Sequence, residues 1–176
     1  MSELTVTRLT DRGMISLRGD LSDDALRSAC TGLSGGDFPE AGHAIVSGDK
    51  GLLWMSPDEV LILLPQEEVG QALETLGSAL AGSHHLAVDV SDARALFRLE
   101  GSGLRDTLQK LTPADLSPAT FGPGRIRRTR LAQVAAALWM PGEGQVDLVC
   151  FRSVADYVQR LLEVAAEGGP VGFHPA

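Results

Sequence analysis

The sequence predicts an α+β fold made of two similar, ferredoxin-like halves, each an antiparallel sheet with helices packed on it. One observation is a repeat: the strand, turn and strand of Leu52–Pro65 recur at Ala136–Phe151, and a Leu-Trp-Met triplet begins at Leu53 and at Leu138, 85 positions apart. A repeat of this length indicates a duplicated supersecondary unit rather than a short-period solenoid. The second observation is that the predicted turns are too short for the crossovers of a parallel sheet.

The first half begins with two segments that alternate apolar and polar residues, Leu4 to Leu9 and Met14 to Arg18. Alternation predicts strands, and the turn chemistry of Asp11-Arg12-Gly13 predicts that these two strands pair with each other. A helix is predicted after Ser22, which can cap it. Apolar residues at spacings of three and four predict its buried stripe: Leu26, Ala29, Cys30 and Leu33.

The segment His43 to Ser47 is expected to form a further strand ahead of the hairpin. In the hairpin turn, Ser56-Pro57-Asp58-Glu59, the proline stands where a type I turn favours it. The run Val60 to Leu64 is apolar on both faces, which is typical of a central strand covered on each side. A helix over Gln66 to Ala81 follows, and its predicted stripe is Val69, Leu73, Leu76 and Leu80.

The joint between the halves is predicted at Ala81 to His84, so a single domain over 1–176 would contain pseudo-repeat halves of about 1–83 and 84–167. After the joint the same order of elements recurs, and 168–176 is predicted to be a C-terminal tail, either mobile or strapped onto a neighbour. The elements predicted for the second half are strands at Leu86 to Val90 and Ala95 to Glu100, a helix at Ser102 to Leu111, a long strand at Leu131 to Met140, its hairpin partner, and a helix from Ser153.

Composition excludes several classes of protein. The chain has 176 residues, 44% hydrophobic and 22% charged, which are ordinary values for a globular domain. Its formal net charge of −8 disfavours nonspecific binding to nucleic acid or to anionic lipid. No signal peptide or apolar stretch of membrane-spanning length is recognisable, which predicts a cytoplasmic protein. Cys30 and Cys150 lack metal or redox spacing and are expected to be buried, reduced thiols.

No motif in the chain predicts catalysis, a cofactor site or a metal site. His84-His85 has no metal-ligand spacing, which favours a solvated pair over a metal site. Gly101-Ser102-Gly103 and Gly122-Pro123-Gly124 resemble fragments of phosphate-binding loops, but neither completes a known motif. They are interpreted as the start of a helix and a turn.

Two further sets of residues have a functional and a structural interpretation. Asp89, Asp92 and Glu100 lie near strands and could serve as a base, but no second titratable partner is identifiable, which favours solvated or capping carboxylates. Trp54 and Trp139 could stack on a flat ligand, but core packing is favoured.

One cluster stands out against the acidic composition: Arg125, Arg127, Arg128 and Arg130 lie within seven residues. Period-two alternation would send Arg128 and Arg130 to one face of a strand and Arg125 and Arg127 to the other. One interpretation is a charged edge strand that resists unwanted pairing. The other is a contact with a partner protein, because arginine is enriched in interface hot spots.

The run Val88 to Trp139, with the strand and helix that follow, resembles the gamma subunit of heterotetrameric sarcosine oxidase. It is more distantly similar to the folate-binding domains of the glycine cleavage T-protein. The first half agrees through Leu52–Pro65, with its Leu-Trp, turn, Pro-Asp-Glu and apolar strand. The resemblance is clearest from Leu52 to Ala166.

This resemblance implies an accessory chain. In such oxidases the alpha and beta subunits carry FAD, FMN and NAD, sarcosine is oxidatively demethylated to glycine with hydrogen peroxide formed, and tetrahydrofolate can accept the one-carbon unit. The gamma chain would carry no cofactor and would assemble with the alpha, beta and delta subunits. The resemblance places the folate-contacting acid of the T-protein on no particular carboxylate here, although Asp89 is nearest by position.

Three functions therefore stay open after the sequence. The chain could be a gamma-type subunit that stabilises the oxidase, a stand-alone folate-binding or aminomethyltransferase-like protein, or an adaptor of the same fold for another oxidase. An isolated chain could also form a homo-oligomer through strands that its partners would otherwise cover.

Overall fold

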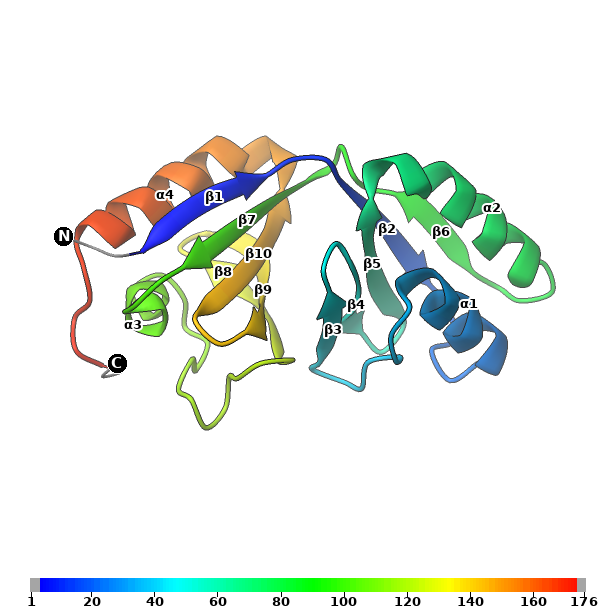
Figure 1. Cartoon of the computed structure of the whole chain (residues 1–176), viewed down its shortest axis with the longest axis horizontal. Coiled ribbons are helices and arrows are strands. Elements are labelled where there is room, and N and C mark those ends of the chain that lie inside the picture. The colour runs from blue at the N-terminus through cyan, green and yellow to red at the C-terminus, as the bar shows by residue number, and fades with distance from the viewer. Residues whose placement is uncertain (1–3, 174–176) are drawn as a thin grey trace. The chain divides into compact units, whose positions relative to one another are not determined.

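A computed structural model describes residues 4–173 and divides the chain into two compact units (Figure 1). Unit 2 is Asp11–Asp92, and unit 1 combines the chain up to Thr10 with everything from Ala93 onward. These units differ from the expected halves at both ends. The first strand of each half belongs to the sheet of the other unit.

Unit 2 contains a five-stranded sheet of order β3-β4-β5-β2-β6, in which every pair of neighbours is antiparallel. Without the edge strand β3, its order β4-β5-β2-β6 is that of a ferredoxin-like unit. The elements are β2 (Arg12–Arg18), α1 (Asp24–Ser34), β3 (Ala44–Ser47), β4 (Lys50–Ser56), β5 (Glu59–Pro65), a 3₁₀ turn η1 (Gln66–Glu68), α2 (Val69–Ala79) and β6 (Leu86–Asp89).

Unit 1 repeats this arrangement with the order β1-β7-β10-β9-β8, again antiparallel throughout. The α+β class with two ferredoxin-like, antiparallel parts is therefore confirmed. The elements are β1 (Thr5–Leu9), β7 (Arg94–Glu100), α3 (Leu104–Gln109), β8 (Ile126–Leu131), β9 (Val134–Gly142), β10 (Gln145–Phe151), a 3₁₀ turn η2 (Arg152–Val154) and α4 (Ala155–Glu167).

The predicted pairing of the first two strands is wrong. β1 pairs with β7, starting at Thr5 opposite Glu100, whereas β2 pairs with β5 and β6. Gly13 explains why the turn signal was misleading. A Cβ at Gly13 would collide with the side chain of Val69 at the start of α2, so this glycine permits close packing rather than a hairpin turn.

The helices cover one face of each sheet, and the predicted stripes supply the contacts. In unit 2, Leu26 and Cys30 of α1 and Val69 and Leu76 of α2 are fully or almost fully buried against the sheet. Ala29, Leu33 and Leu73 are partly buried against the same core, as predicted. β5 is the central strand, and its residues from Glu59 to Leu64 are all buried.

The two tryptophans are not equivalent, which corrects the predicted alignment of the triplets. Leu52 pairs with Ile62 in one hairpin and Leu138 pairs with Leu148 in the other, and all four belong to the cores beneath the helices. The residue matching Trp54 is therefore Met140. Trp139 lies one position earlier, so its side chain points to the other face of its sheet.

The long strand predicted from Leu131 to Met140 corresponds to β9, but β9 begins only at Val134, because Leu131 is the last residue of β8. β8 ends at Leu131, the chain turns through Ala132 and Gln133, and β9 begins at Val134. Ala132 has a positive φ of 51°, a conformation that glycine or asparagine usually supplies. Across residues 4–173, no helix combines the length and apolarity needed to cross a membrane.

The predicted tail 168–176 is described as far as Phe173, and 174–176 lie outside the described residues. From Val171 to Phe173, the backbone donates hydrogen bonds to Asp106 of α3. This part of the tail is thus bound to its own chain.

Candidate functional site

The arginine cluster lies on an edge strand. β8 is the last strand in the order of its sheet, and Arg127, Arg128 and Arg130 belong to it, while Arg125 directly precedes it. Arg128 and Arg130 share one face with Ile126, and Arg127 lies on the opposite face, as alternation predicted. The edge-strand position is therefore confirmed.

The guanidinium of Arg127 is bound within the fold. It donates to the carbonyl oxygens of Ile126 and Thr120 and lies 5.9 Å from the centre of the Phe121 ring. The side chains of Arg125, Arg128 and Arg130 are exposed. The sequence could not separate these roles, since Thr120 and Phe121 lie in an irregular segment.

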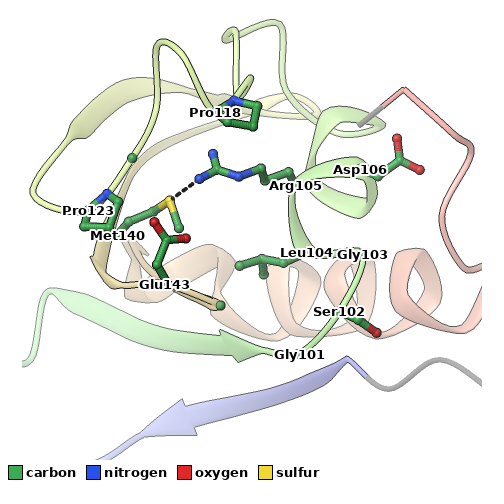
Figure 2. Close-up of a pocket in the computed structure, with 12 residues that line it drawn as sticks. Gly101, Ser102, Gly103, Leu104, Arg105, Asp106, Pro118, Pro123, Met140 and Glu143 are labelled. Carbon is green, nitrogen blue, oxygen red and sulfur yellow. Dashed lines mark hydrogen bonds between the residues drawn. The ribbon is translucent and has the colours of Figure 1, made fainter. Parts of the chain in front are cut away.

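A cavity of about 380 Å³ opens in unit 1 beside α3 (Figure 2). It lies where the β7–α3 turn, the β9–β10 turn and the irregular segment before β8 meet. Its lining consists of Gly101, Ser102, Gly103, Leu104, Arg105, Asp106, Pro118, Gly122, Pro123, Met140, Glu143 and Gly144. Both glycine-rich segments noted in the sequence thus border one cavity, although neither completes a phosphate-binding motif.

Arg105 forms one wall of this cavity and orders the segment that covers it. Its guanidinium donates to the carbonyl oxygens of Leu116, at 2.9 Å, and Phe121. It also reaches the sulfur of Met140 at 3.1 Å, the contact drawn in Figure 2. Arg105 thus links α3 to β9 and also holds the segment between α3 and β8, which contains Leu116 and Phe121, in place beside the cavity.

The cavity has the features of a binding pocket. Its ionisable side chains are Arg105, Asp106 and Glu143, and its lining contains no histidine, cysteine or lysine. The carboxylate of Asp106 points away from Arg105, toward the C-terminal segment (Figure 2). The lining thus combines the guanidinium of Arg105 with the carboxylate of Glu143, an arrangement that suits a bound polar side chain or small molecule.

The other candidates from the sequence occupy structural or exposed positions. Asp89, at the end of β6, accepts hydrogen bonds from the backbone N–H and hydroxyl of Ser91, at 2.9 and 2.6 Å. Asp92 and Glu100 are exposed. His84 is exposed, and the Nδ1 of His85 lies 2.9 Å from the carbonyl oxygen of Ser83. Among residues 4–173, no three histidine, cysteine or acidic side chains gather into a possible metal site.

The same fold occurs in a solved aminomethyltransferase structure. The crystal structure of glycine cleavage system aminomethyltransferase T from Bartonella henselae matches 92% of this chain and 45% of that chain with a TM-score of 0.67. At 10% sequence identity, this likeness establishes the fold alone.

Sequence comparison gives the family. The model of the sarcosine oxidase gamma subunit family matches residues 18–167, and the chain belongs to this family. It is 35% identical over 136 residues to the sarcosine oxidase subunit gamma of Corynebacterium sp. (strain U-96), and 34% identical over 136 residues to that of Arthrobacter sp. These alignments cover 76% of this chain but only 63% and 64% of the two relatives, so the chain spans less than two thirds of their length.

A solved assembly contains a chain of the same fold. The heterotetrameric sarcosine oxidase from Corynebacterium sp. U-96, in complex with pyrrole 2-carboxylate, includes a chain that matches with a TM-score of 0.82 and 28% identity. The match covers 94% of this chain and 84% of that chain.

Proposed function

We propose that this chain is the accessory, gamma-type subunit of a heterotetrameric sarcosine oxidase. The observation that carries the proposal is the match over 94% of the chain, at a TM-score of 0.82, to a chain of such an oxidase. Its partners would be alpha, beta and delta subunits in the cytoplasm. These would carry FAD, FMN and NAD, oxidise sarcosine to glycine with formation of hydrogen peroxide, and pass the one-carbon unit to tetrahydrofolate.

In this proposal the chain contributes surfaces that the other subunits contact during assembly, and it catalyses no reaction itself. Arg125, Arg128 and Arg130 are exposed at a sheet edge in a chain whose net charge is −8. A concentrated positive patch on an acidic protein suits an acidic surface on a partner subunit. Arg127 would act indirectly, by holding the segment before β8 in place.

Co-expression of the four subunits tests the accessory role. Omitting this chain should reduce the yield of assembled oxidase while leaving the flavin spectrum of any purified assembly unchanged. The triple variant Arg125→Glu, Arg128→Glu and Arg130→Glu should weaken association about tenfold or more, with a strong dependence on salt. Arg27→Glu on α1 of unit 2 is the matched control, since Arg27 is exposed and its guanidinium lies over the Phe38 ring of its own unit. Assembly at full yield without this chain would contradict the proposal.

A second candidate is a stand-alone folate-binding or aminomethyltransferase-like protein. The shared fold with aminomethyltransferase T and the 380 Å³ cavity favour it. Met140 and Glu143 line the cavity, so substitutions there test whether a ligand binds in it, and isothermal titration calorimetry measures the binding. Saturable binding of tetrahydrofolate, lost on Glu143→Lys substitution, would support this candidate against the accessory role.

A further inference from the structure

The guanidinium of Arg105 carries a positive charge that no described carboxylate compensates. Its acceptors are the carbonyl oxygens of Leu116, at 2.9 Å, and Phe121, and the sulfur of Met140, at 3.1 Å, and all three are neutral. None of the ion pairs between residues 4 and 173 includes Arg105. Because the side chain is partly buried in the wall of the cavity, its charge is screened less than in bulk water. Arg105 can therefore attract an anionic group into the cavity.

Two N–H groups of Arg105 remain available for such an anion. A guanidinium has five N–H donors. Nη1 donates to the carbonyl oxygens of Leu116 and Phe121, and Nη2 reaches the sulfur of Met140, which accounts for three of them. In the part of the chain that the structure describes, Nε and the second hydrogen of Nη2 have no acceptor. Parallel donors of this kind are how arginine binds a carboxylate at two points.

Glu143 supplies the opposite charge in the same cavity. It lies in the turn between β9 and β10, and Figure 2 shows its carboxylate directed toward the place where Arg105 meets Met140. Glu143 is exposed, and its carboxylate makes no hydrogen bond or ion pair with the other described residues. Asp106, the other acid in the lining, is bound to the backbone of Gly172 and Phe173. Glu143 is therefore the acid that a ligand in the cavity would meet.

The rest of the lining limits the kind of molecule that fits. Its larger side chains are apolar: Leu104, Pro118, Pro123 and Met140. The volume of about 380 Å³ lies near the lower end of the range for small-molecule pockets. A phosphate group is disfavoured, because Glu143 would repel it and because none of the described lining residues is a lysine or histidine. The lining thus suits a small molecule with one negative group, one positive group and an apolar part.

We propose that this cavity binds a zwitterionic amino acid with an apolar side chain. The carboxylate of the amino acid accepts hydrogen bonds from Arg105, its ammonium group faces Glu143, and its side chain packs against Met140 and the prolines of the lining. A ligand with only one of the two charges leaves either Arg105 or Glu143 without a partner. The inference goes beyond the proposed function and does not depend on it, because the cavity lies within unit 1 of this chain.

Isothermal titration calorimetry of the full-length chain with three related probes tests the inference. The probes are L-leucine, isocaproate, which lacks the ammonium group of leucine, and isopentylamine, which lacks its carboxylate. We expect saturable binding of L-leucine. Both analogues should bind about tenfold or more weakly, since each loses one charge-assisted interaction.

The substitution Glu143→Gln tests the position of the ligand. It should weaken the binding of L-leucine about tenfold without weakening that of isocaproate, which has no ammonium group to lose a partner. Because Glu143 is exposed, the melting temperature should be unchanged. The matched control is Glu40→Gln in unit 2, where the side chain is also exposed. Arg105 stays unaltered in these variants, because its contacts hold the cavity wall in place.

Selective loss of L-leucine binding in Glu143→Gln supports the amino-acid site. No saturable binding of L-leucine, equal affinity for L-leucine and isocaproate, or equal losses in Glu143→Gln and Glu40→Gln would each overturn it. Saturable binding of tetrahydrofolate without binding of L-leucine would also overturn it, in favour of the second candidate function. The measurement needs no other subunit, so its result is separate from that of the assembly experiment.

Discussion

Arg98 of β7 and Asp147 of β10 are direct cross-strand partners joined by two hydrogen bonds, from Nε to Oδ1 at 2.8 Å and from Nη2 to Oδ2 at 2.9 Å. The side chain of Asp147 is 3% exposed and that of Arg98 is 24% exposed. A bidentate geometry of this kind compensates much of the cost of burying both charges, but only while both partners are present.

Removing one partner should therefore cost more than removing both. We expect Asp147→Ala to lower the free energy of unfolding by about 3 to 5 kcal/mol, since it leaves the arginine without its buried carboxylate. The double variant Arg98→Met and Asp147→Leu should recover most of that loss. Urea denaturation of the three proteins measures the difference, and equal losses in the single and double variants would contradict this account.

The two tryptophans should differ in their importance for stability. Trp139 is completely buried, and its indole N–H has no acceptor among the described residues, whereas Trp54 is only partly buried. Trp139→Ala should cost about 3 to 5 kcal/mol of unfolding free energy, and Trp54→Ala clearly less. Thermal and urea unfolding of both variants checks the order, which a larger loss for Trp54→Ala would reverse.

The turn between β8 and β9 should become more stable with glycine. Ala132 adopts a φ of 51°, which costs an L-residue about 1 to 2 kcal/mol relative to its usual conformations. We expect Ala132→Gly to raise the melting temperature. Ala135→Gly is the control: Ala135 is exposed within β9, where glycine should be destabilising. A decrease in both variants would show that the turn carries no such strain.

The buried thiols predict a loss of stability at alkaline pH. Burial raises the pKa of the Cys30 thiol from 9.0 to about 12 and that of Cys150 to about 11. Above pH 9 the unfolded chain releases these protons while the folded chain retains them, so stability should fall from pH 9 toward pH 11, by up to about 1.4 kcal/mol per pH unit for each thiol.

The comparison protein for this experiment is Cys30→Ala with Cys150→Ala. Urea denaturation between pH 8 and pH 11 should give it a shallower decline than the unaltered chain, since other groups that titrate in this range are common to both. Parallel declines would exclude a contribution from the thiols.

Local patterns in the sequence were sufficient for much of the fold. The apolar stripe of α1 follows from side-chain periodicity, the central strand β5 from its unbroken apolar run, and the edge position of the arginine cluster from its charge. The pairing of β1 could not be predicted from neighbouring residues. Strands β1 and β2 follow each other in the chain, but each completes a different sheet, and Gly13 serves packing against Val69.

The remaining errors have equally specific causes. The turn at Ala132 lacks the glycine, asparagine or proline that signals a hairpin, so the predicted strand begins at Leu131 instead of Val134. The two Leu-Trp-Met triplets align in the sequence, but the equivalent core residues are Leu52 and Leu138. The structural alignment is therefore shifted by one position, and Trp139 lies on the face opposite to that of Trp54. The cavity depends on contacts of Arg105, and the binding of residues 171–173 depends on contacts of Asp106. Both side chains contact backbone groups that are distant in the sequence, and sequence spacing gives no signal for such contacts.

Native mass spectrometry of the N-terminally tagged chain, purified after co-expression with alpha, beta and delta subunits, is the decisive test of its role as an accessory subunit. We expect an assembly with one copy of each subunit, a flavin absorbance spectrum and hydrogen peroxide formation that depends on sarcosine. Recovery of the tagged chain alone or only as a homo-oligomer, with the other three subunits assembled and active without it, would contradict the account.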